Sequence, residues 1–344
     1  MLLKENQLLA PFTTFGIGGP ARWFVEAEKA DDLIEAAYWA REHGVELFVL
    51  GGGSNLLVSD TGFEGMVLRV SLKGIERQGD LFRCGAGEDW DRFVSIVVAQ
   101  GYAGIECLAG IPGTVGGTPV QNVGAYGQEV DSVIERVRAF DLQKWEHVEL
   151  PKAQCGFAYR RSRFNSTDRG RFIVTGVDFR LRRDGAPQIT YADLKAHFKG
   201  LTGTPGLSEV ATEVREIRKG KGMLLVEGDP DCRSAGSFFK NPEVAQAVAE
   251  RVRSFAKDAG VALQVFPAKG GLVKIPAAWL IEQAGFPKGY AVGAAGISSR
   301  HTLALINRGG ATAEDILGLA QKIAAAVLER FGIQLEMEPV MVGF

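Results

Sequence analysis

Two glycine-rich segments constrain this chain more than any other feature. The first, GGGSN, spans residues 51–55 and directly follows the apolar run VELFVL at residues 45–50. The second, IPGTVGGTPVQNVGAYG, spans residues 111–127. Glycine lets the backbone adopt positive φ and approach a ligand closely, and successive free N–H groups form a concave anion site. Glycines that only make tight turns are the simpler alternative, but two polar loops that both contain asparagine favour ligand binding.

The first loop ends a predicted β-α-β unit. RWFVEA at residues 22–27 and VELFVL are predicted strands, and ADDLIEAAYWAREHG between them has the apolar spacing of a helix that its glycine ends. The end of such a strand is where a ligand-binding turn is placed. Neither loop reads G-x-x-x-x-G-K-[ST], nor G-x-G-x-x-G opening a helix, which disfavours an ATPase and a standard nicotinamide-binding fold. The remaining candidate ligand is a diphosphate, held by backbone amides and by the hydroxyls of Ser54, Thr114 and Thr118.

The remaining pattern predicts an N-terminal α+β region to about residue 200 and a smaller α/β region after about residue 220. In the first region we expect strands at 66–71, 81–87 and 171–183, a hairpin from 133–141 and 144–150, and helices at 89–101, 190–198 and 207–222. In the second region we expect helices at 275–285 and 312–332, a closing strand at 333–344, and a helix at 241–260 with Asn241 as its cap and Pro242 in its first turn.

Composition excludes several classes of function. The formal net charge of −2 over 344 residues provides no basic field for nucleic acid or an anionic membrane. The four cysteines and four histidines are scattered without C-x-x-C or H-E-x-x-H spacing, so we expect neither a disulfide framework nor a metal site. The N-terminus lacks the pattern of a signal peptide, and no apolar run reaches the ~18 residues of a membrane span. We therefore expect a cytoplasmic protein.

Six motifs follow one another along the chain: TTFGIGGPA, VLGGGSNLLVSD, GIECLAGIPGTVGGTPVQNVGAYGQE, YRRSRF, SAGSFFKNP and LEMEP. In this order they resemble the UDP-N-acetylenolpyruvoylglucosamine reductase (MurB) family, and the resemblance covers nearly the whole chain. It implies an α+β class, with an FAD-binding fold of the vanillyl-alcohol-oxidase (PCMH) type followed by a smaller α/β substrate-binding domain. The implied domains are FAD-binding subdomain 1 at 1–70, FAD-binding subdomain 2 at 71–220 joined by the C-terminal strand 333–344, and the substrate-binding domain at 221–332.

The resemblance also implies the chemistry. The family reduces an enolpyruvyl ether of UDP-N-acetylglucosamine to UDP-N-acetylmuramate in peptidoglycan precursor synthesis, with NADPH as the reductant. Hydride passes from NADPH to N5 of FAD and then to C3 of the enolpyruvyl group, and C2 is protonated. Related oxidases tether their flavin through a histidine beside the first glycine loop, and LGGGSNLL has none, so we expect non-covalent FAD. We expect a monomer, and the sequence shows no motif that ranks NADPH over NADH.

Residues that match the family's motifs take its roles by resemblance. Arg160, Ser237 and Glu338 match the catalytic arginine, serine and glutamate. The substrate-binding candidates are Tyr191, Arg218, Lys221, Asn241 and His301. The FAD-binding candidates lie in the two glycine loops and are Gly51, Gly52, Gly53, Ser54, Asn55, Gly113, Thr114, Gly116, Gly117, Thr118, Asn122, Gly124, Ala125 and Tyr126.

The last motif departs from the family's pattern, because Pro339 and Val340 follow the glutamate where Val-Arg is usual. Residues two apart in a strand share a face, so the alternation does not choose between Glu336 and Glu338. Alignment with Gly343 favours Glu338.

The residue types fit the implied reaction. An arginine fork matches two carboxylate oxygens, and Arg218 and Lys221 stand one helical turn apart, where both can meet a diphosphate. Each residue also has an ordinary structural alternative: a strand-end arginine, a turn serine, a solvated glutamate or a cationic helix end. Two other functions remain open, an oxygen-using alcohol oxidase of the same fold and a non-catalytic nucleotide-sugar-binding protein.

Overall fold

The computed structural model describes residues 1–200 and 202–344, and its contacts divide the chain into two units. The first unit comprises residues 1–8, 20–53 and 63–220, and the second comprises residues 9–19, 54–62 and 221–344. The chain passes from the first unit to the second between residues 220 and 221, and a substrate-binding role for residues 221–332 stays a prediction. Two early segments, residues 9–19 and 54–62, group with the second unit, although the sequence had placed them in the first FAD-binding subdomain.

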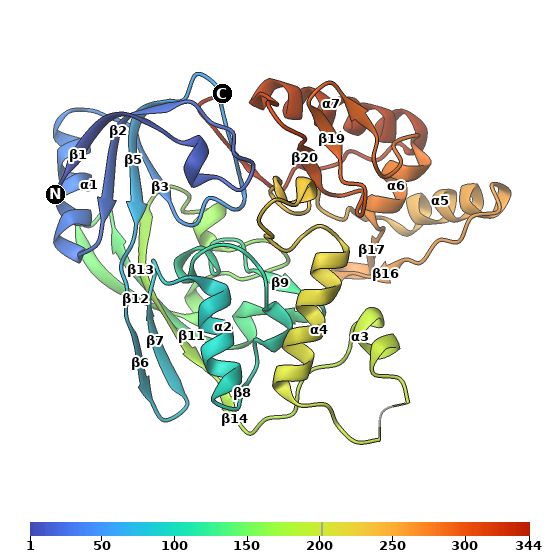
Figure 1. The fold of residues 1–344 in the computed structure, drawn as a ribbon, viewed down its shortest axis with the longest axis horizontal. Helices are drawn as coiled ribbons and strands as arrows, with labels where there is room; N and C mark the ends of the chain where they lie inside the picture. Colours follow the sequence, from blue (N-terminus) through green and yellow to red (C-terminus); the bar gives the residue numbers. More distant parts are fainter. Residues whose placement is uncertain (201) are drawn as a thin grey trace. The chain divides into compact units, whose positions relative to one another are not determined.

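One sheet of the first unit carries the first glycine loop (Figure 1). Its order is β1-β2-β5-β3, with β1 antiparallel to β2 and with β2 and β3 both parallel to β5. The strands are β1 Leu3–Leu8, β2 Pro20–Ala27, β3 Leu47–Leu50 and β5 Phe63–Val70. Helix α1, Ala30–Glu42, connects β2 to β3 and buries Leu33, Ala36, Ala37 and Ala40. The predicted β-α-β unit is confirmed, with β5 lying between its two strands.

The second sheet of this unit is antiparallel throughout, in the order β12-β11-β13-β7-β6. Its strands are β6 Ile75–Gln78, β7 Leu81–Gly85, β11 Ile134–Asp141, β12 Glu146–Pro151 and β13 Phe172–Arg180. The predicted hairpin is the β11–β12 pair. The helices are α2 Trp90–Ala99, α3 Ala192–His197 and α4 Leu207–Gly220, and α2 and α4 pack side by side (Figure 1).

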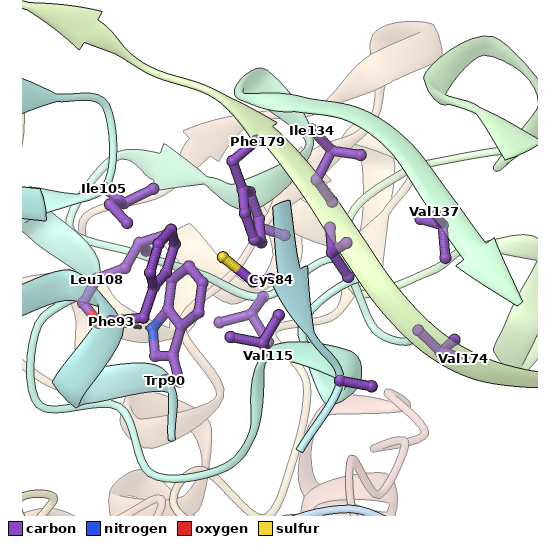
Figure 2. Packing of buried hydrophobic residues seen from close by; sticks show 14 of the residues in the cluster. Cys84, Trp90, Phe93, Ile105, Leu108, Val115, Ile134, Val137, Val174 and Phe179 are labelled. Atoms are coloured by element: carbon purple, nitrogen blue, oxygen red, sulfur yellow. Dashed lines mark hydrogen bonds between the residues drawn. The ribbon is translucent and has the colours of Figure 1, made fainter. Parts of the chain in front are cut away.

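An aromatic cluster beneath α2 forms the centre of this unit's core (Figure 2). The Phe93 and Phe179 rings lie 5.2 Å apart, and each is 5.9 Å from the Trp90 ring. The Trp90 indole N–H donates to the Leu108 carbonyl at 3.1 Å, so the buried polar end of this side chain is satisfied. Val115 of the second glycine loop belongs to the same core, which fixes the loop to the sheet and to α2.

Short elements complete the first unit. They are the strand pairs β8 Tyr102–Ala103 with β14 Arg182–Arg183 and β9 Gly124–Ala125 with β10 Gln128–Glu129, and the 3₁₀ turns η2 Glu106–Leu108, η3 Val115–Gly117, η4 Val130–Ser132, η5 Lys152–Gln154 and η6 Arg163–Asn165.

The second unit packs three helices with small sheets around its own core. The helices are α5 Gln246–Asp258, α6 Ala277–Gln283 and α7 Ala313–Phe331. The sheets are β15 Glu243–Val244, β17 Val273–Lys274 and β16 Phe266–Pro267; β18 Ala291–Val292, β19 Ala295–Ile297 and β20 Leu305–Asn307; and β4 Leu56–Val58 with β21 Val340–Val342. The 3₁₀ turns are η1 Ala10–Phe12, η7 Pro230–Cys232 and η8 Lys269–Gly271.

The start of α5 differs from the sequence prediction. The helix begins at Gln246, because Glu243 and Val244 pair with β17 as a strand. Asn241 does not cap α5. Its Oδ1 instead accepts a hydrogen bond from the Ala277 amide at 2.9 Å and so caps α6.

The end of the chain pairs within the second unit. Strand β21 runs parallel to β4, and the Ser59 amide donates to the Val342 carbonyl at 2.8 Å. The sequence had attached residues 333–344 to the second FAD-binding subdomain, whereas their pairing groups them with the second unit. A parallel pair between residues so far apart in the chain has no local sequence signal.

Both ends of α7 follow the local rules for a helix. The Thr312 hydroxyl accepts from the Asp315 amide at 3.0 Å, the Asp315 carboxylate accepts from the Thr312 amide at 2.9 Å, and Gly332 ends the helix with a φ of +66°. Among the described residues, no helix is long and apolar enough to cross a membrane.

Removal of this cap should weaken the second unit. We expect Thr312→Ala to lower the free energy of unfolding by about 0.5–2 kcal/mol, because one amide of the first turn loses its acceptor. Thr312→Ser keeps the hydroxyl and serves as the matched control. Urea unfolding of the two variants measures the difference, and equal stability would show that the cap contributes nothing.

Candidate active site

The two glycine loops touch each other within the first unit. A Cβ on Gly52 would lie 2.5 Å from the Cα of Gly113 and 3.0 Å from the Thr114 amide nitrogen. A Cβ on Gly51 would lie 3.0 Å from the Thr114 hydroxyl oxygen. Real Cβ atoms essentially never approach another atom so closely, so this contact requires glycine at position 52.

The contact brings together backbone N–H groups from both glycine loops. Among the described residues, the backbone N–H groups of Gly51, Gly52, Gly53, Gly113 and Thr114 donate no hydrogen bond. Backbone amides are rarely left without an acceptor in a folded protein. Gly53 also has a φ of +64°, the left-handed conformation found in anion-binding turns. These amides fit the diphosphate of a dinucleotide such as FAD.

The second loop is held in place by its own backbone. The Val115 amide donates to the Glu88 carbonyl and the Gly116 amide to the Ala86 carbonyl, each at 2.8 Å. A Cβ on Gly116 would lie 2.6 Å from the Ala86 Cβ, so this glycine allows the loop to lie against β7 and its continuation. A Cβ on Gly117 would meet only the Thr114 hydroxyl, at 3.9 Å.

Thr118 and Asn122 are buried, and their side chains bond within the first unit. The Thr118 hydroxyl donates to the Val115 carbonyl at 2.8 Å. The Asn122 side chain donates to the Ala158 carbonyl and accepts from the Asp131 amide, each at 3.1 Å. Both residues therefore shape the loop, and Asn122 also connects it to the turn that carries Arg160.

Arg160 lies in a tight turn closed by hydrogen bonds between Ala158 and Arg161, and its φ is +53°. Such a φ is uncommon for a residue other than glycine and often marks a functional constraint. The Arg160 guanidinium donates to the Gly124 carbonyl at 2.6 Å. A Cβ on Gly124 would lie 3.1 Å from Nη1 of Arg160, so the arginine packs directly on the second glycine loop.

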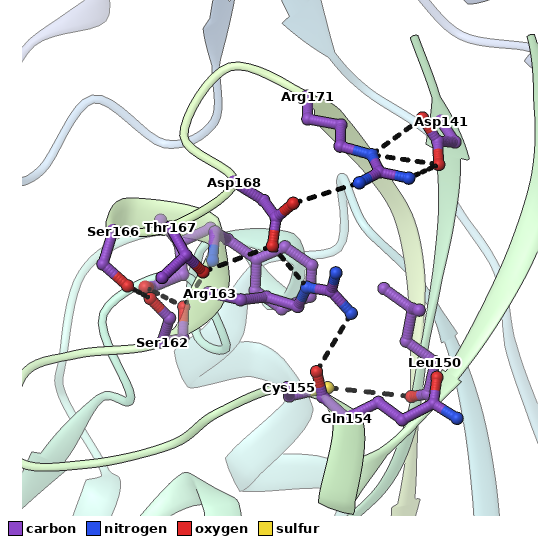
Figure 3. Close-up of polar contacts among 12 residues, drawn as sticks. Asp141, Leu150, Gln154, Cys155, Ser162, Arg163, Ser166, Thr167, Asp168 and Arg171 are labelled. Carbon is purple, nitrogen blue, oxygen red and sulfur yellow. Dashed lines mark hydrogen bonds and ion pairs between the residues drawn. The ribbon is translucent and has the colours of Figure 1, made fainter. Parts of the chain in front are cut away.

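Ion pairs fasten the segment that carries Arg160 to the β11–β12 hairpin (Figure 3). Arg163 pairs with Asp168 at 2.9 Å, and Arg171 pairs with Asp168 at 3.1 Å and with Asp141 at 2.7 Å. Hydrogen bonds from Arg171 lower the pKa of Asp141 to about 2, so its carboxylate stays ionised above that pH.

The turn also has a direct contact with the second glycine loop. The Ser162 hydroxyl donates to the Val120 carbonyl at 2.6 Å, while the Ser162 amide donates to the Asn165 side chain at 2.9 Å. Sequence reasoning missed these supporting residues, for which the Ser-x-x-Asn spacing of a small capping box was the available signal.

Tyr126 of the second loop contacts a second tyrosine and a buried arginine. The Tyr126 and Tyr191 rings meet edge to face with centroids 5.3 Å apart. Tyr126 forms a side-chain hydrogen bond with Arg218, and Arg218 Nε donates to the Gly110 carbonyl at 3.0 Å. Burial lowers the pKa of Arg218 from its ordinary value. The structure thus brings together three of the predicted site residues.

The second unit brings Ser237 and Glu338 onto neighbouring extended segments. Ser237 pairs with Ala304, and the Glu338 amide donates to the Phe238 carbonyl at 2.9 Å. Gly236 precedes Ser237 with a φ of +71°, so the turn into this segment requires a residue that tolerates left-handed backbone. Buried Phe238 and Phe239 anchor the segment in the core.

The surroundings of Glu336 and Glu338 differ. Glu336 is exposed, and its carboxylate pairs with the Lys240 ammonium. Glu338 is half-buried. Asn55 donates from its side chain to the Glu338 carbonyl at 3.2 Å and accepts from the Val340 amide at 2.9 Å, so it holds the segment around this glutamate. Which of the two carboxylates is functional stays a prediction.

The remaining predicted residues occupy less regular positions. His301 Nδ1 accepts from the Leu303 amide at 3.1 Å, which fixes the imidazole in the turn before β20. Asn241 uses its Oδ1 to cap α6, as described above. Lys221 follows Gly220, the last residue of α4, so a shared helical face with Arg218 does not describe it. Ser54, whose carbonyl oxygen lies 3.5 Å from the Thr14 hydroxyl, and Asn55 both fall in the second unit.

Metal ligands are not grouped in this protein as far as the structure describes it. Within residues 1–200 and 202–344, no cluster of three or more His, Cys, Asp or Glu side chains has the arrangement of a metal site. The four cysteines are buried and unpaired.

Comparisons with known proteins decide the family. A model described as FAD binding domain matches residues 21–144, and one described as UDP-N-acetylenolpyruvoylglucosamine reductase, C-terminal domain, matches residues 229–342. UDP-N-acetylenolpyruvoylglucosamine reductase of Streptomyces avermitilis is 45% identical over 97% of this chain and 93% of the relative. The Thermobifida fusca enzyme of the same name is 45% identical over 98% of each chain. This chain belongs to the UDP-N-acetylenolpyruvoylglucosamine reductase family.

A solved structure supports the same conclusion. The crystal structure of UDP-N-acetylenolpyruvylglucosamine reductase (MurB) from Thermus caldophilus matches with a TM-score of 0.69 and 28% identity, covering 99% of this chain and 100% of that one. The predicted α+β class and the FAD-binding fold of the N-terminal domain are thereby confirmed. FAD is the cofactor of its N-terminal domain.

A substitution at the contact between the two glycine loops tests the predicted FAD site. Gly52→Ala places a methyl group against Gly113 and forces the loops apart, at a cost of about 1–3 kcal/mol for an overpacked contact. We expect FAD affinity to fall by about five- to a hundredfold, because the displaced amides lose their common ligand. Flavin content after purification and titration of the apoprotein with FAD measure the effect.

Gly318→Ala is the matched control, because a Cβ there meets no described atom within 4 Å beyond its own helix. It should purify with the flavin content of the parent. Full flavin occupancy in Gly52→Ala would show that the loop contact does not hold the cofactor.

Proposed function

We propose that this protein catalyses the NADPH-dependent reduction of UDP-N-acetyl-3-O-(1-carboxyvinyl)glucosamine to UDP-N-acetylmuramate in peptidoglycan precursor synthesis. Family membership over the whole chain is the observation that carries the proposal. A bound FAD supplies the hydride carrier between NADPH and the sugar nucleotide. The proposal for the chain's own residues concerns how they bind the substrate, stabilise charge and deliver a proton.

Arg160 is proposed to stabilise the substrate carboxylate. Hydride addition at C3 of the enolpyruvyl group moves negative charge towards C2 and its carboxylate, and a fixed positive group lowers the energy of that charge where it develops. A guanidinium matches two oxygens with two parallel N–H bonds. The Gly124 carbonyl engages one arm of Arg160 and so orients the fork.

Ser237 is proposed to protonate C2. A serine hydroxyl is a weak acid in water, but an enolate is basic enough to remove its proton. The turn at Gly236 and the buried Phe238 and Phe239 hold the serine backbone in one place. A fixed donor of this kind delivers the proton without first reorganising its surroundings.

Glu338 is proposed to bind the substrate carboxylate when protonated or to orient a water molecule. Its half-buried position and the contact of its backbone with Asn55 support this choice over Glu336, whose carboxylate Lys240 neutralises at the surface. In this proposal, Asn55 holds the backbone of the segment that carries Glu338.

Tyr191, Arg218 and Lys221 are proposed to bind the UDP part of the substrate, together with Asn241 and His301. Arg218 is buried beside the Gly110 carbonyl and Tyr126, and its guanidinium presents the positive charge and N–H groups that suit a diphosphate. Tyr191 is 42% exposed and presents its ring beside Tyr126, as a stacking contact for a nucleotide requires.

The two other functions suggested by the sequence are less well supported. An oxygen-using oxidase with tethered flavin would need a histidine beside the first glycine loop, and residues 49–60 contain none. A nucleotide-sugar-binding protein without flavin would have no use for the amides gathered between Gly52 and Gly113.

Lys221→Ala should weaken binding of the sugar nucleotide and leave reduction of the flavin by NADPH at the parent rate. Loss of a charge-assisted bond to phosphate costs about 1.5–3 kcal/mol, so the KM for the sugar nucleotide should rise about ten- to a hundredfold. Lys219→Ala, which removes an exposed lysine of α4, is the control and should leave this KM unchanged. A main defect in flavin reduction would reassign Lys221 to NADPH.

Ser237→Ala should separate the two half-reactions. If the hydroxyl only protonates C2, the variant folds, retains FAD and is reduced by NADPH at the parent rate. Reoxidation by the enolpyruvyl substrate should slow by about 10²–10⁴, the usual contribution of a positioned acid. Stopped-flow flavin absorbance, recorded separately for each half-reaction, measures both rates.

Two further variants complete this test. Ser237→Cys retains a proton donor and should recover part of the reoxidation rate. Ser234→Ala removes a buried hydroxyl that accepts from the Gly236 amide at 3.2 Å, so it should affect stability and spare the reoxidation rate. Reoxidation of Ser237→Ala at the parent rate would exclude Ser237 as the acid.

A further inference from the structure

Glu106 is a buried carboxylate outside the proposed catalytic groups. It lies in the 3₁₀ turn η2, and its side chain is fully buried. Among the described residues it forms no ion pair, and its charge is instead satisfied by three hydrogen bonds. Oε2 accepts from the Gly104 amide at 2.7 Å, and Oε1 accepts from the Gln128 side chain at 2.7 Å and from the Gln188 amide at 2.8 Å.

These bonds join three distant parts of the chain. Gln128 lies two residues after Tyr126 of the second glycine loop, and Gln188 lies three residues before Tyr191. One carboxylate oxygen therefore receives donors from both tyrosine-bearing segments. A buried charge tolerates no loss of such donors without a large desolvation penalty, so the geometry of both segments depends on Glu106.

Gln188 is held through three of its polar groups. Its amide donates to Glu106, its carbonyl accepts from the Cys107 thiol at 3.1 Å, and its side chain donates to the Gly127 carbonyl at 2.7 Å. Burial and the neighbouring Glu106 charge raise the pKa of Cys107 to about 12, which keeps the thiol protonated as a donor.

Beyond Gln188, the chain is attached again on α4. Leu194 of α3 is buried in the core of the first unit, and His197 Nδ1 lies 2.9 Å from a Glu213 carboxylate oxygen. Tyr191 stands between these two attachments, with its ring against Tyr126. The Glu106 end is the one that also contacts the segment of Tyr126, through Gln128.

We infer that Glu106 is a positioning residue that sets the Tyr126–Tyr191 pair for binding of the nucleotide sugar. The inference rests on the proposed role of Tyr191 in substrate binding. Glu106 itself acts through Gln128 and Gln188 and needs no contact with the substrate. Its effect belongs to the binding of the sugar nucleotide and not to the reduction of the flavin.

Glu106→Gln tests the inference with an almost isosteric change. A glutamine has one acceptor oxygen for three donors, so its NH₂ group faces at least one N–H and the junction must shift. We expect both the Kd and the KM for the enolpyruvyl UDP-sugar to rise about tenfold, as for one charge-assisted bond lost. Flavin content, the rate of reduction by NADPH and kcat at saturating substrate should stay close to the parent values.

A double-mutant cycle with Tyr191→Ala shows whether Glu106 acts through the tyrosine. Calorimetric titration of the oxidised holoenzyme with the enolpyruvyl UDP-sugar gives Kd for the parent, both single variants and the double variant. We expect Glu106→Gln to weaken binding in the parent and to have no further effect in the Tyr191→Ala background. Full additivity, or an unchanged Kd in a folded Glu106→Gln protein, would overturn the inference.

Two controls separate the alternatives. Glu88→Gln alters another buried carboxylate, which accepts from the Gly74 amide at 2.7 Å, and should lower Tm while leaving Kd unchanged. If Glu106→Gln does not fold, Gln128→Ala removes the side-chain bond to Glu106 and must show the same dependence on Tyr191. A parent protein that neither binds nor reduces the sugar nucleotide would contradict the proposed function. A parent that binds it, with additive variants, contradicts only the role of Glu106.

Discussion

The approach of Gly52 to Gly113 is the contact on which the first unit's binding surface depends. A Cβ at position 52 would lie 2.5 Å from the Gly113 Cα, so the two loops meet backbone to backbone. That proximity places the amides of Gly51, Gly52, Gly53, Gly113 and Thr114 together, and within the described residues none of them donates elsewhere. In the proposed site, these amides would hold the FAD diphosphate without any lysine, in keeping with two loops that carry no nucleotide-binding motif with a cation. Arg160 and Tyr126 then take their places from the same second loop.

Much of this arrangement follows from local sequence signals. The β2-α1-β3 unit was predictable because its apolar spacing changes from strand to helix and back within a short segment. The position of the first loop at the end of β3 follows directly from that order. The ends of α7 were predictable for the same reason, since Thr312 at its start and Gly332 at its end each act on the adjoining turn of the helix. The identity of the cofactor could be predicted only from the family motifs, because glycine spacing alone indicates an anion-binding site and does not specify a flavin.

Other features depend on partners far away in the sequence. Asn241 looked like the cap of the next helix, but pairing of β15 with β17 used the following residues and turned Asn241 towards α6. Asn55, whose role at the cofactor stays a prediction, bonds through its side chain to the backbone of Glu338, 283 positions later. Glu106 stands within the third family motif, but its role had no sequence signal, since its donors at Gln128 and Gln188 meet it only in the folded chain. The ion pair between Lys240 and Glu336, on which the proposal for Glu338 depends, likewise joins residues far apart in the sequence.

The central claim is that one protein takes electrons from NADPH and passes them to an enolpyruvyl sugar nucleotide. The most direct measurement is the visible absorption spectrum of the purified protein under anaerobic conditions. We predict an oxidised flavin spectrum that is bleached by one equivalent of NADPH and restored by one equivalent of the enolpyruvyl UDP-sugar, with UDP-N-acetylmuramate as the product. A colourless protein that binds the sugar nucleotide, or a flavin that NADPH reduces and only oxygen reoxidises, would contradict the account.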